Sequence, residues 1–142
     1  MTDKPLTIAD YPLAENRPDL VRSARGKALE ELTVEAVMNG DVTLEDLRIT
    51  PDALEQQGEI SRAAGRDKLA DNFDRASEMA RVPQPVIMEI YEILRPGRAA
   101  DKTVLLAAAL RLRQDYEAEG LAKFVEEAAL IYEKRGLFST RY

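Results

Sequence analysis

The chain has 142 residues, of which 45% are hydrophobic and 32% charged, and this suits one globular domain with a modest core. Its 26 acidic and 20 basic residues give a formal net charge of −6, which argues against a nucleic-acid-binding platform and against adhesion to an anionic membrane. Because the chain has no Cys and no His, disulfides, thiolate and imidazole metal ligands, and every Ser-His or Cys-His catalytic arrangement are excluded.

Metal sites built from oxygen ligands alone, for magnesium or calcium, stay open after these exclusions. No apolar run approaches the ~20 residues of a membrane span, and the N-terminal residues contain no apolar signal core. We therefore expect a soluble cytoplasmic protein.

The first 28 residues carry little helical periodicity and contain three prolines. Because a residue before proline favours β or polyproline geometry, we predict an extended N-terminal arm and loop over residues 1–28. The arm either folds back on the core of its own chain or docks on a partner through Tyr11 and Leu13. The basic run 22–27, RSARGK, is interpreted as a solvated turn, because Gly26 alone does not make a phosphate-binding loop.

Two short helices are predicted next from their capping residues. Thr33 is placed to cap the first, which Asn39 and Gly40 should end. Thr43, with Asp46 three residues later, repeats the N-terminal capping pattern. The two pieces are compatible with a small helical hairpin.

Thr50 and Pro51 mark the clearest helix start, since Thr suits the N-cap and Pro the first helical position. The helix should run at least to Ala64. One of its faces is a stripe of small residues that permits close approach of another helix: Leu54, Gly58, Ser61 and Gly65. Whether residues 51–80 form one helix or two stays open.

Residues 63–98 are the most strongly punctuated stretch. The helical spacing predicts an apolar stripe made of Leu69, Phe73, Ala76 and Ala80. Pro83 and Pro85 then break the helix, and a second helical pattern runs from Ile87 until Pro96 stops it.

Asp101 can cap a further helical region over residues 102–135. Gly120 lies inside this region, so we predict two helices or one kinked helix, with Gly136 as the C-terminal stop. The whole pattern predicts an all-α fold: a compact bundle of several helices with an extended N-terminal arm. Residues 29–142 would form a single helical domain.

Several carboxylates share a helix face, but each pair lies beside basic residues on what the pattern predicts to be the solvated side. Helix ion pairs explain them better than an acid/base site, which needs burial. The pairs are Asp67 with Asp71, Asp71 with Asp74, and Asp115 with Glu119.

Three tyrosines, Tyr91, Tyr116 and Tyr132, fall on apolar stripes and are predicted to pack in the core. Arg95 and Arg98 make a basic corner that either holds a carboxylate of a partner chain or caps the preceding helix. None of these features is a catalytic constellation, so we assign no catalytic, cofactor-binding or metal-binding residue.

Short runs of residues at near-constant spacing carry a resemblance from about Asp10 to Leu137. In the central stretch they are Ala64-Gly65-Arg66-Asp67, Leu69-Ala70, Asn72-Phe73, Arg75-Ala76, Val82-Pro83, Ile90-Tyr91, Leu94-Arg95-Pro96 and Arg98. Outside it they include Asp10-Tyr11-Pro12-Leu13-Ala14, Arg48-Ile49-Thr50-Pro51 and Glu127-Ala128-Ala129. This ordered series resembles the small (gamma) subunits of adenosylcobalamin-dependent diol and glycerol dehydratases. The chain departs from their pattern at Gly58 and Ser61, where alanines are usual, and at Gly97, where an aromatic residue is.

The resemblance implies a lyase that converts 1,2-propanediol or glycerol to propionaldehyde or 3-hydroxypropionaldehyde plus water by a radical mechanism. It implies a heterohexamer with two copies each of large (alpha), medium (beta) and small subunits. Adenosylcobalamin would bind between the large and medium subunits, and the diol with a potassium or calcium ion would bind in the large subunit. The helical small subunit would pack on the large one and bind no cofactor. A place inside a bacterial microcompartment is compatible with the family.

Five residues are predicted to contribute to the partner interface: Tyr11, Leu13, Phe73, Arg95 and Arg98. The alternative is a free-standing helical interaction or adaptor module without an enzymatic role. That alternative explains the acidic composition and the missing catalytic site equally well, but it does not explain the ordered series of matches.

Overall fold

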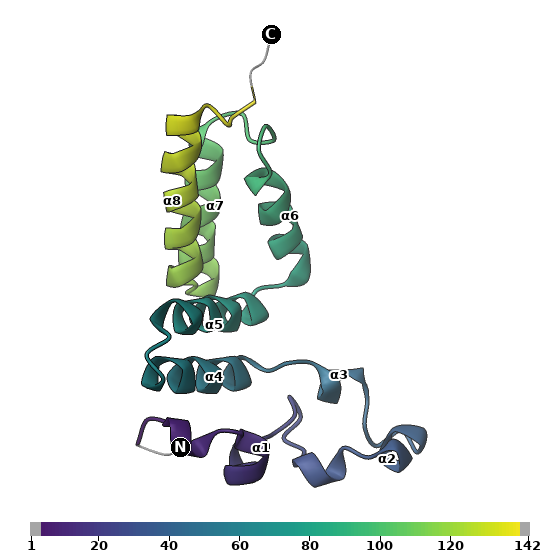
Figure 1. Cartoon of the computed structure of the whole chain (residues 1–142). Helices are drawn as coiled ribbons and strands as arrows, with labels where there is room; N and C mark the ends of the chain where they lie inside the picture. The colour runs from purple at the N-terminus through teal and green to yellow at the C-terminus, as the bar shows by residue number, and fades with distance from the viewer. Residues whose placement is uncertain (1–3, 140–142) are drawn as a thin grey trace. The chain divides into compact units, whose positions relative to one another are not determined.

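The computed structural model describes residues 4–139, and within them the chain forms helices, turns and loops with no β-strand. The all-α prediction is therefore confirmed. None of these described helices is both long enough and apolar enough to cross a membrane. Figure 1 shows the helices, which follow one another as η1 (Ile8–Asp10), α1 (Leu13–Asn16), η2 (Pro18–Leu20), η3 (Leu29–Glu31), α2 (Val34–Met38), α3 (Leu44–Leu47), α4 (Pro51–Ala63), α5 (Asp67–Arg81), α6 (Gln84–Leu94), α7 (Lys102–Tyr116) and α8 (Glu119–Arg135).

Local caps begin and end several helices at the predicted places. The side chains of Thr33, Thr50 and Asp101 each accept a hydrogen bond from a backbone N–H in the first turn of α2, α4 and α7. Gly136 ends α8 in the left-handed region, with φ of 65°. These caps need only residues close in sequence, which is why the spacing alone indicates them.

The extended N-terminal arm is not confirmed, because residues 4–28 include the turns η1, α1 and η2. The Asp10 carboxylate accepts the Thr7 N–H at 2.8 Å, and the Asn16 amide donates to the Tyr11 carbonyl at 2.9 Å. Such side-chain bonds to the backbone stabilise turns against the extended geometry that the prolines favour. Residues 1–3 of the predicted arm lie outside the described residues.

α4 and α5 are separate helices, which answers the question left open by the sequence. Gly65 ends α4 with a left-handed φ of 72°. On α4, a Cβ added to Gly58 would lie 2.9 Å from Asp74 Oδ1 and 3.6 Å from the Ala70 carbonyl oxygen, both on α5. The absence of a side chain at Gly58 therefore lets the two helices approach closely.

The predicted apolar stripe of α5 is partly wrong. Leu69 is 40% exposed and Ala80 is also exposed, whereas Ala70 and Ser77 are almost completely buried. The Ser77 hydroxyl donates to the Glu55 carboxylate of α4 at 2.7 Å. The close approach of α4 favours small side chains on the facing side of α5, so Ala70 is buried while its larger neighbour Leu69 is not.

Contacts within the chain divide it into two compact units, one ending at Ser77 and the other beginning at Glu78. The domain boundary that we predict between residues 28 and 29 stays a prediction. The main hydrophobic core belongs to the second unit and joins α6, α7 and α8.

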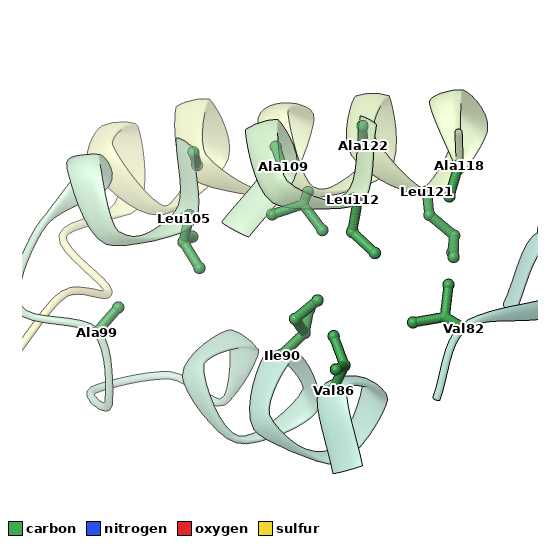
Figure 2. Packing of buried hydrophobic residues seen from close by; sticks show 12 residues of the cluster. Val82, Val86, Ile90, Ala99, Leu105, Ala109, Leu112, Ala118, Leu121 and Ala122 are labelled. Carbon is green, nitrogen blue, oxygen red and sulfur yellow. The ribbon is translucent and has the colours of Figure 1, made fainter. Parts of the chain in front are cut away.

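In this core, Val86 and Ile90 of α6 face Leu105 and Leu112 of α7, as Figure 2 shows. α7 and α8 lie side by side (Figure 1). Fully buried alanines permit the close packing of these two helices: Ala109, Ala122 and Ala129. The second unit is thus a small helical bundle whose buried core consists of aliphatic side chains and alanine.

Of the two alternatives that the sequence leaves open for residues 102–135, two helices is right, but the break does not lie at Gly120. It lies at Glu117 and Ala118, where Glu117 adopts a left-handed φ of 53° and the Ala118 N–H donates to the Leu112 carbonyl at 3.0 Å. This hydrogen bond ends α7 without a glycine.

Gly120 instead lies in the first turn of α8, where it makes room for a carboxylate. Glu78 accepts the N–H of Gly120 at 3.0 Å and that of Leu121 at 2.8 Å. A Cβ on Gly120 would lie 3.1 Å from the nearer Glu78 oxygen. Since the N-cap residue Ala118 has no side-chain acceptor, Glu78 provides the cap of α8 from a distant part of the chain.

Candidate partner-binding surface

A buried carboxylate joins two loops of the first unit. The Asp46 side chain, on α3, is 0% exposed. Arg25 Nε donates to both of its oxygens at 3.0 and 2.9 Å, and Arg25 Nη2 donates to the same group. The Ser23 hydroxyl donates to Oδ1 at 2.8 Å and the Thr43 N–H to Oδ2 at 3.0 Å. Four donors therefore satisfy this buried negative charge.

The same side chains also bind backbone groups. Arg25 Nη2 donates to the Asp41 carbonyl at 2.8 Å. The Ser23 hydroxyl accepts the N–H groups of Arg25 at 3.2 Å and Lys27 at 3.0 Å. We call this network the Arg25–Asp46 tie. It fastens the turn at Ser23–Lys27 to residues 41–46 and closes the intervening chain into a loop.

Hydrogen bonds from the Arg25 guanidinium hold the pKa of the Asp46 carboxyl well below its usual range. The Thr43 N–H and the Ser23 hydroxyl lower it further, and burial opposes them. A carboxyl whose pKa falls on folding stabilises the fold above its unfolded value of about 3.8. That contribution disappears as the pH drops through the folded pKa, so the tie persists at neutral pH and weakens only in strong acid.

Asp46→Asn is expected to loosen the loop, because the amide keeps the shape but loses the charge that binds Arg25. Hydrogen exchange at the Thr43 amide should become about tenfold faster. At pH 7 the variant should unfold at a lower urea concentration than the wild type. Below about pH 4 this difference should begin to shrink, because the Asp46 carboxyl of the unfolded wild-type chain becomes protonated there, whereas that of the folded chain stays charged until stronger acid.

The matched control for this prediction is Asp41→Asn, which changes an exposed carboxyl but leaves the carbonyl that Arg25 binds. Its unfolding midpoint should stay close to that of the wild type at both pH values. Equal effects of the two substitutions, or a difference for Asp46→Asn that does not change with pH, would contradict the role given to the tie.

Two of the predicted interface residues, Tyr11 and Leu13, lie in very different surroundings. Leu13 is buried and packs with Leu6 and Ile60 in a small cluster of the first unit. Tyr11 is 57% exposed. From the sequence, the N-terminal residues are interpreted either as folded back on the chain's own core or as docked on a partner. Leu13 follows the first interpretation, because it is buried within its own chain and is not available at the surface. Tyr11 stays a candidate contact.

The other three predicted residues remain at or near the surface. Phe73 is half-buried beside α4, and its Cβ would lie 3.5 Å from a Cβ added to Gly58. Arg95 and Arg98 are exposed, and both pair with Glu92, at 3.0 and 3.2 Å. Both arginines thus bind a carboxylate of their own chain, and a role in holding a partner's carboxylate stays a prediction.

Asp71, Asp74, Asp115 and Glu119 form ion pairs, as predicted, but only Asp115 with Arg111 (4.0 Å) and Glu119 with Lys123 (3.6 Å) pair within one helix. Arg62 lies 2.7 Å from Asp74 and 3.6 Å from Asp71, and all three side chains are about half exposed. Glu119 pairs with Arg113 at 2.6 Å, and hydrogen bonds from this arginine lower the pKa of Glu119. Nowhere in residues 4–139 do three or more His, Cys, Asp or Glu side chains come together in a group that could hold a metal ion.

Among the tyrosines predicted to lie in the core, Tyr91 is the exception. The Tyr132 hydroxyl donates to the Leu94 carbonyl, and Tyr116 packs against the core cluster. Tyr91 is 61% exposed, because the buried face of α6 passes through its neighbour Ile90.

Sequence reasoning missed the Arg25–Asp46 tie. The turn predicted over residues 22–27 is present, but Ser23 is buried and Arg25 binds Asp46, so the turn is not simply solvated. The local capping pattern from Thr43 already accounts for Asp46. The signal that could have found the tie is that the run 22–27 contains no acidic residue to pair with Arg25. The partner of Arg25 is Asp46, which lies 21 residues away in the sequence.

Comparisons with known proteins agree on one family. The family model described as "Dehydratase small subunit" matches residues 6–139. The propanediol dehydratase small subunit of Citrobacter freundii is 47% identical over 128 residues, which cover 90% of this chain and 74% of that protein. The corresponding subunit of Salmonella typhimurium (strain LT2) is 46% identical over 134 residues, covering 94% and 77%. The chain therefore belongs to the dehydratase small-subunit family and is one subunit of a lyase complex that also contains larger subunits.

Proposed function

We propose that this chain is the non-catalytic small subunit of a coenzyme-B12-dependent dehydratase. The enzyme would convert 1,2-propanediol or glycerol to propionaldehyde or 3-hydroxypropionaldehyde plus water, with the radical chemistry in the large subunit. The observation that carries the proposal is the 47% identity to a propanediol dehydratase small subunit over 90% of the chain. The proposed assembly is a heterohexamer with two copies each of the large, medium and small subunits.

The proposal assigns adenosylcobalamin and the potassium or calcium ion to the other subunits. The chain has no His that could serve as an imidazole ligand to cobalt. Its described carboxylates are also not clustered as a potassium or calcium site requires. In this proposal the chain contributes to catalysis by supporting the subunit that holds the diol.

Co-expression with the large and medium subunits of the proposed enzyme tests the proposal. A tagged copy of this chain should purify as a three-component complex whose native mass fits two copies of each subunit. The complex should form aldehyde from 1,2-propanediol or glycerol only when adenosylcobalamin is added. The ratio of the two rates identifies the preferred diol.

The control preparation omits this chain and keeps the other two subunits. We expect it to lose most of its activity, because the large subunit lacks its small partner. If the two larger subunits are fully active alone and this chain elutes by itself, the dehydratase proposal is wrong and the adaptor alternative replaces it.

A further inference from the structure

Residues 29–49 expose most of their large apolar side chains. We call them the 29–49 segment. It contains nine large aliphatic or Met side chains, of which only Val42 is buried and Leu32 is half-buried. The seven exposed ones are Leu29, Val34, Val37, Met38, Leu44, Leu47 and Ile49. Single exposed apolar residues are ordinary, but seven within one short segment mark an interaction surface.

The exposed side chains are arranged on faces of short helices. Val34, Val37 and Met38 follow the i, i+3, i+4 spacing, so they lie on one side of α2. Val34 is 82% and Met38 80% exposed. On α3, Leu44 and Leu47 have the i, i+3 spacing and are both exposed. Neither helix uses its apolar face to build the core of its own unit.

The backbone of the segment is nevertheless well bonded. Thr33 caps α2, Thr43 with Asp46 caps α3, and the Arg25–Asp46 tie closes the loop that contains both helices. Figure 1 shows α2 and α3 as two short helices joined by loops. The apolar side chains thus face outward from a backbone that polar groups hold in place.

The charge of the 29–49 segment indicates the chemistry of the partner surface that would cover it. The 29–49 segment contains six acidic residues and one basic residue, Arg48. Glu30, Glu35 and Glu45 are exposed, and Glu45 also interacts electrostatically with Arg25. A complementary surface would be apolar in its centre and bordered by Lys and Arg.

We propose that the 29–49 segment is the principal surface through which this chain docks on a larger dehydratase subunit. The docking site on that subunit is apolar and has a basic border. This inference rests on the proposed function for the identity of the partner. It goes further by naming the residues of this chain that make the contact, which include none of the five interface residues predicted from the sequence.

The test is a competition for assembly. Wild-type and variant chains with different tags are co-expressed with the larger subunits, and their ratio in the purified complex is measured by mass spectrometry. The double substitution Val34→Gln with Met38→Gln should lower incorporation about tenfold or more, since both side chains would lose their apolar contacts. Reversing two charges, Glu35→Lys with Glu45→Lys, should lower it several-fold.

The matched control makes the same chemical change at exposed positions of the second unit, Met88→Gln with Leu130→Gln. It should assemble within about twofold of the wild type. Circular dichroism of each purified variant should match that of the wild type, because all the substituted side chains are exposed and support no core.

The outcomes separate this inference from the proposed function. If the wild type assembles and the Val34/Met38 variant assembles equally well, or the control loses as much, the segment is not the principal docking surface although the proposed function stands. If the charge-reversed variant assembles as well as the wild type, the basic border is wrong. If the wild type itself does not join the complex, both proposals fail.

The oligomeric state of the purified chain tests a different occupant. A purified wild type that dimerises alone, with a monomeric Val34/Met38 variant, would show that the occupant is a second copy of this chain.

Discussion

Leu112→Ala is expected to lower the free energy of unfolding by about 2–5 kcal/mol. Leu112 is 1% exposed and lies in the core between α6, α7 and α8. Its neighbours include the buried alanines Ala109 and Ala122, which have no spare atoms to fill the space that a lost isobutyl group leaves. A loss of this size is a large part of the ~5–15 kcal/mol that stabilises a typical domain.

Urea unfolding followed by circular dichroism measures this effect. Leu110→Ala is the matched control, because it makes the same change on the same helix at a side chain that is 49% exposed. The control should cost about 1 kcal/mol or less. If the two substitutions shift the midpoint equally, Leu112 does not occupy the tightly packed core described above.

Glu78→Ala is expected to cost about 1–2 kcal/mol, the usual effect of removing an N-terminal helix cap. Glu78 accepts two N–H groups in the first turn of α8, at 3.0 and 2.8 Å, and the N-cap residue Ala118 provides no side-chain acceptor. Without the carboxylate these donors keep no protein partner, and the favourable interaction of a negative charge with the N-terminus of α8 is lost.

Hydrogen exchange locates this effect more sharply than the unfolding midpoint does. Amide protection at Gly120 and Leu121 should fall in Glu78→Ala and fall less in Glu78→Gln, which keeps one acceptor oxygen. Glu127→Ala removes an exposed carboxylate farther along α8 and should leave these two amides unchanged. Unaltered protection in Glu78→Ala would mean that the carboxylate is not the cap of α8.

The sequence predicts well whatever depends on neighbouring residues. Thr33, Thr50 and Asp101 begin helices because an N-cap needs only the next turn of the chain. The core positions of Tyr116 and Tyr132 are also predicted correctly, since a regular 3.6-residue period shows which face of a helix is buried.

What the sequence does not predict depends on groups that are distant in the chain. Glycine often marks a break between helices, yet Gly120 lies within α8. It leaves room there for the carboxylate of Glu78, which is 42 residues earlier in the chain. In the same way, the burial of Leu13 depends on Ile60, and that of Asp46 depends on Arg25. No local pattern contains such pairs.

The candidate interface shows the same limit. Tyr11, Arg95 and Arg98 are exposed as expected, but the density of exposed apolar residues in the 29–49 segment cannot be recognised from the sequence. There, Val34, Val37 and Met38 have the spacing of an ordinary core-facing helix. Only the structure shows that this apolar face has no covering element among the chain's described buried clusters.

The Arg25–Asp46 tie also determines when the 29–49 segment loses its conformational freedom. A segment that orders only on binding spends part of its interaction free energy on fixing backbone dihedrals, about 1–2 kcal/mol for each residue. Here the Ser23, Thr43 and Arg25 hydrogen bonds fix the loop during folding. In the proposed docking this segment would meet its partner as a preformed surface, and its apolar contacts would contribute to affinity with little left to order in this chain.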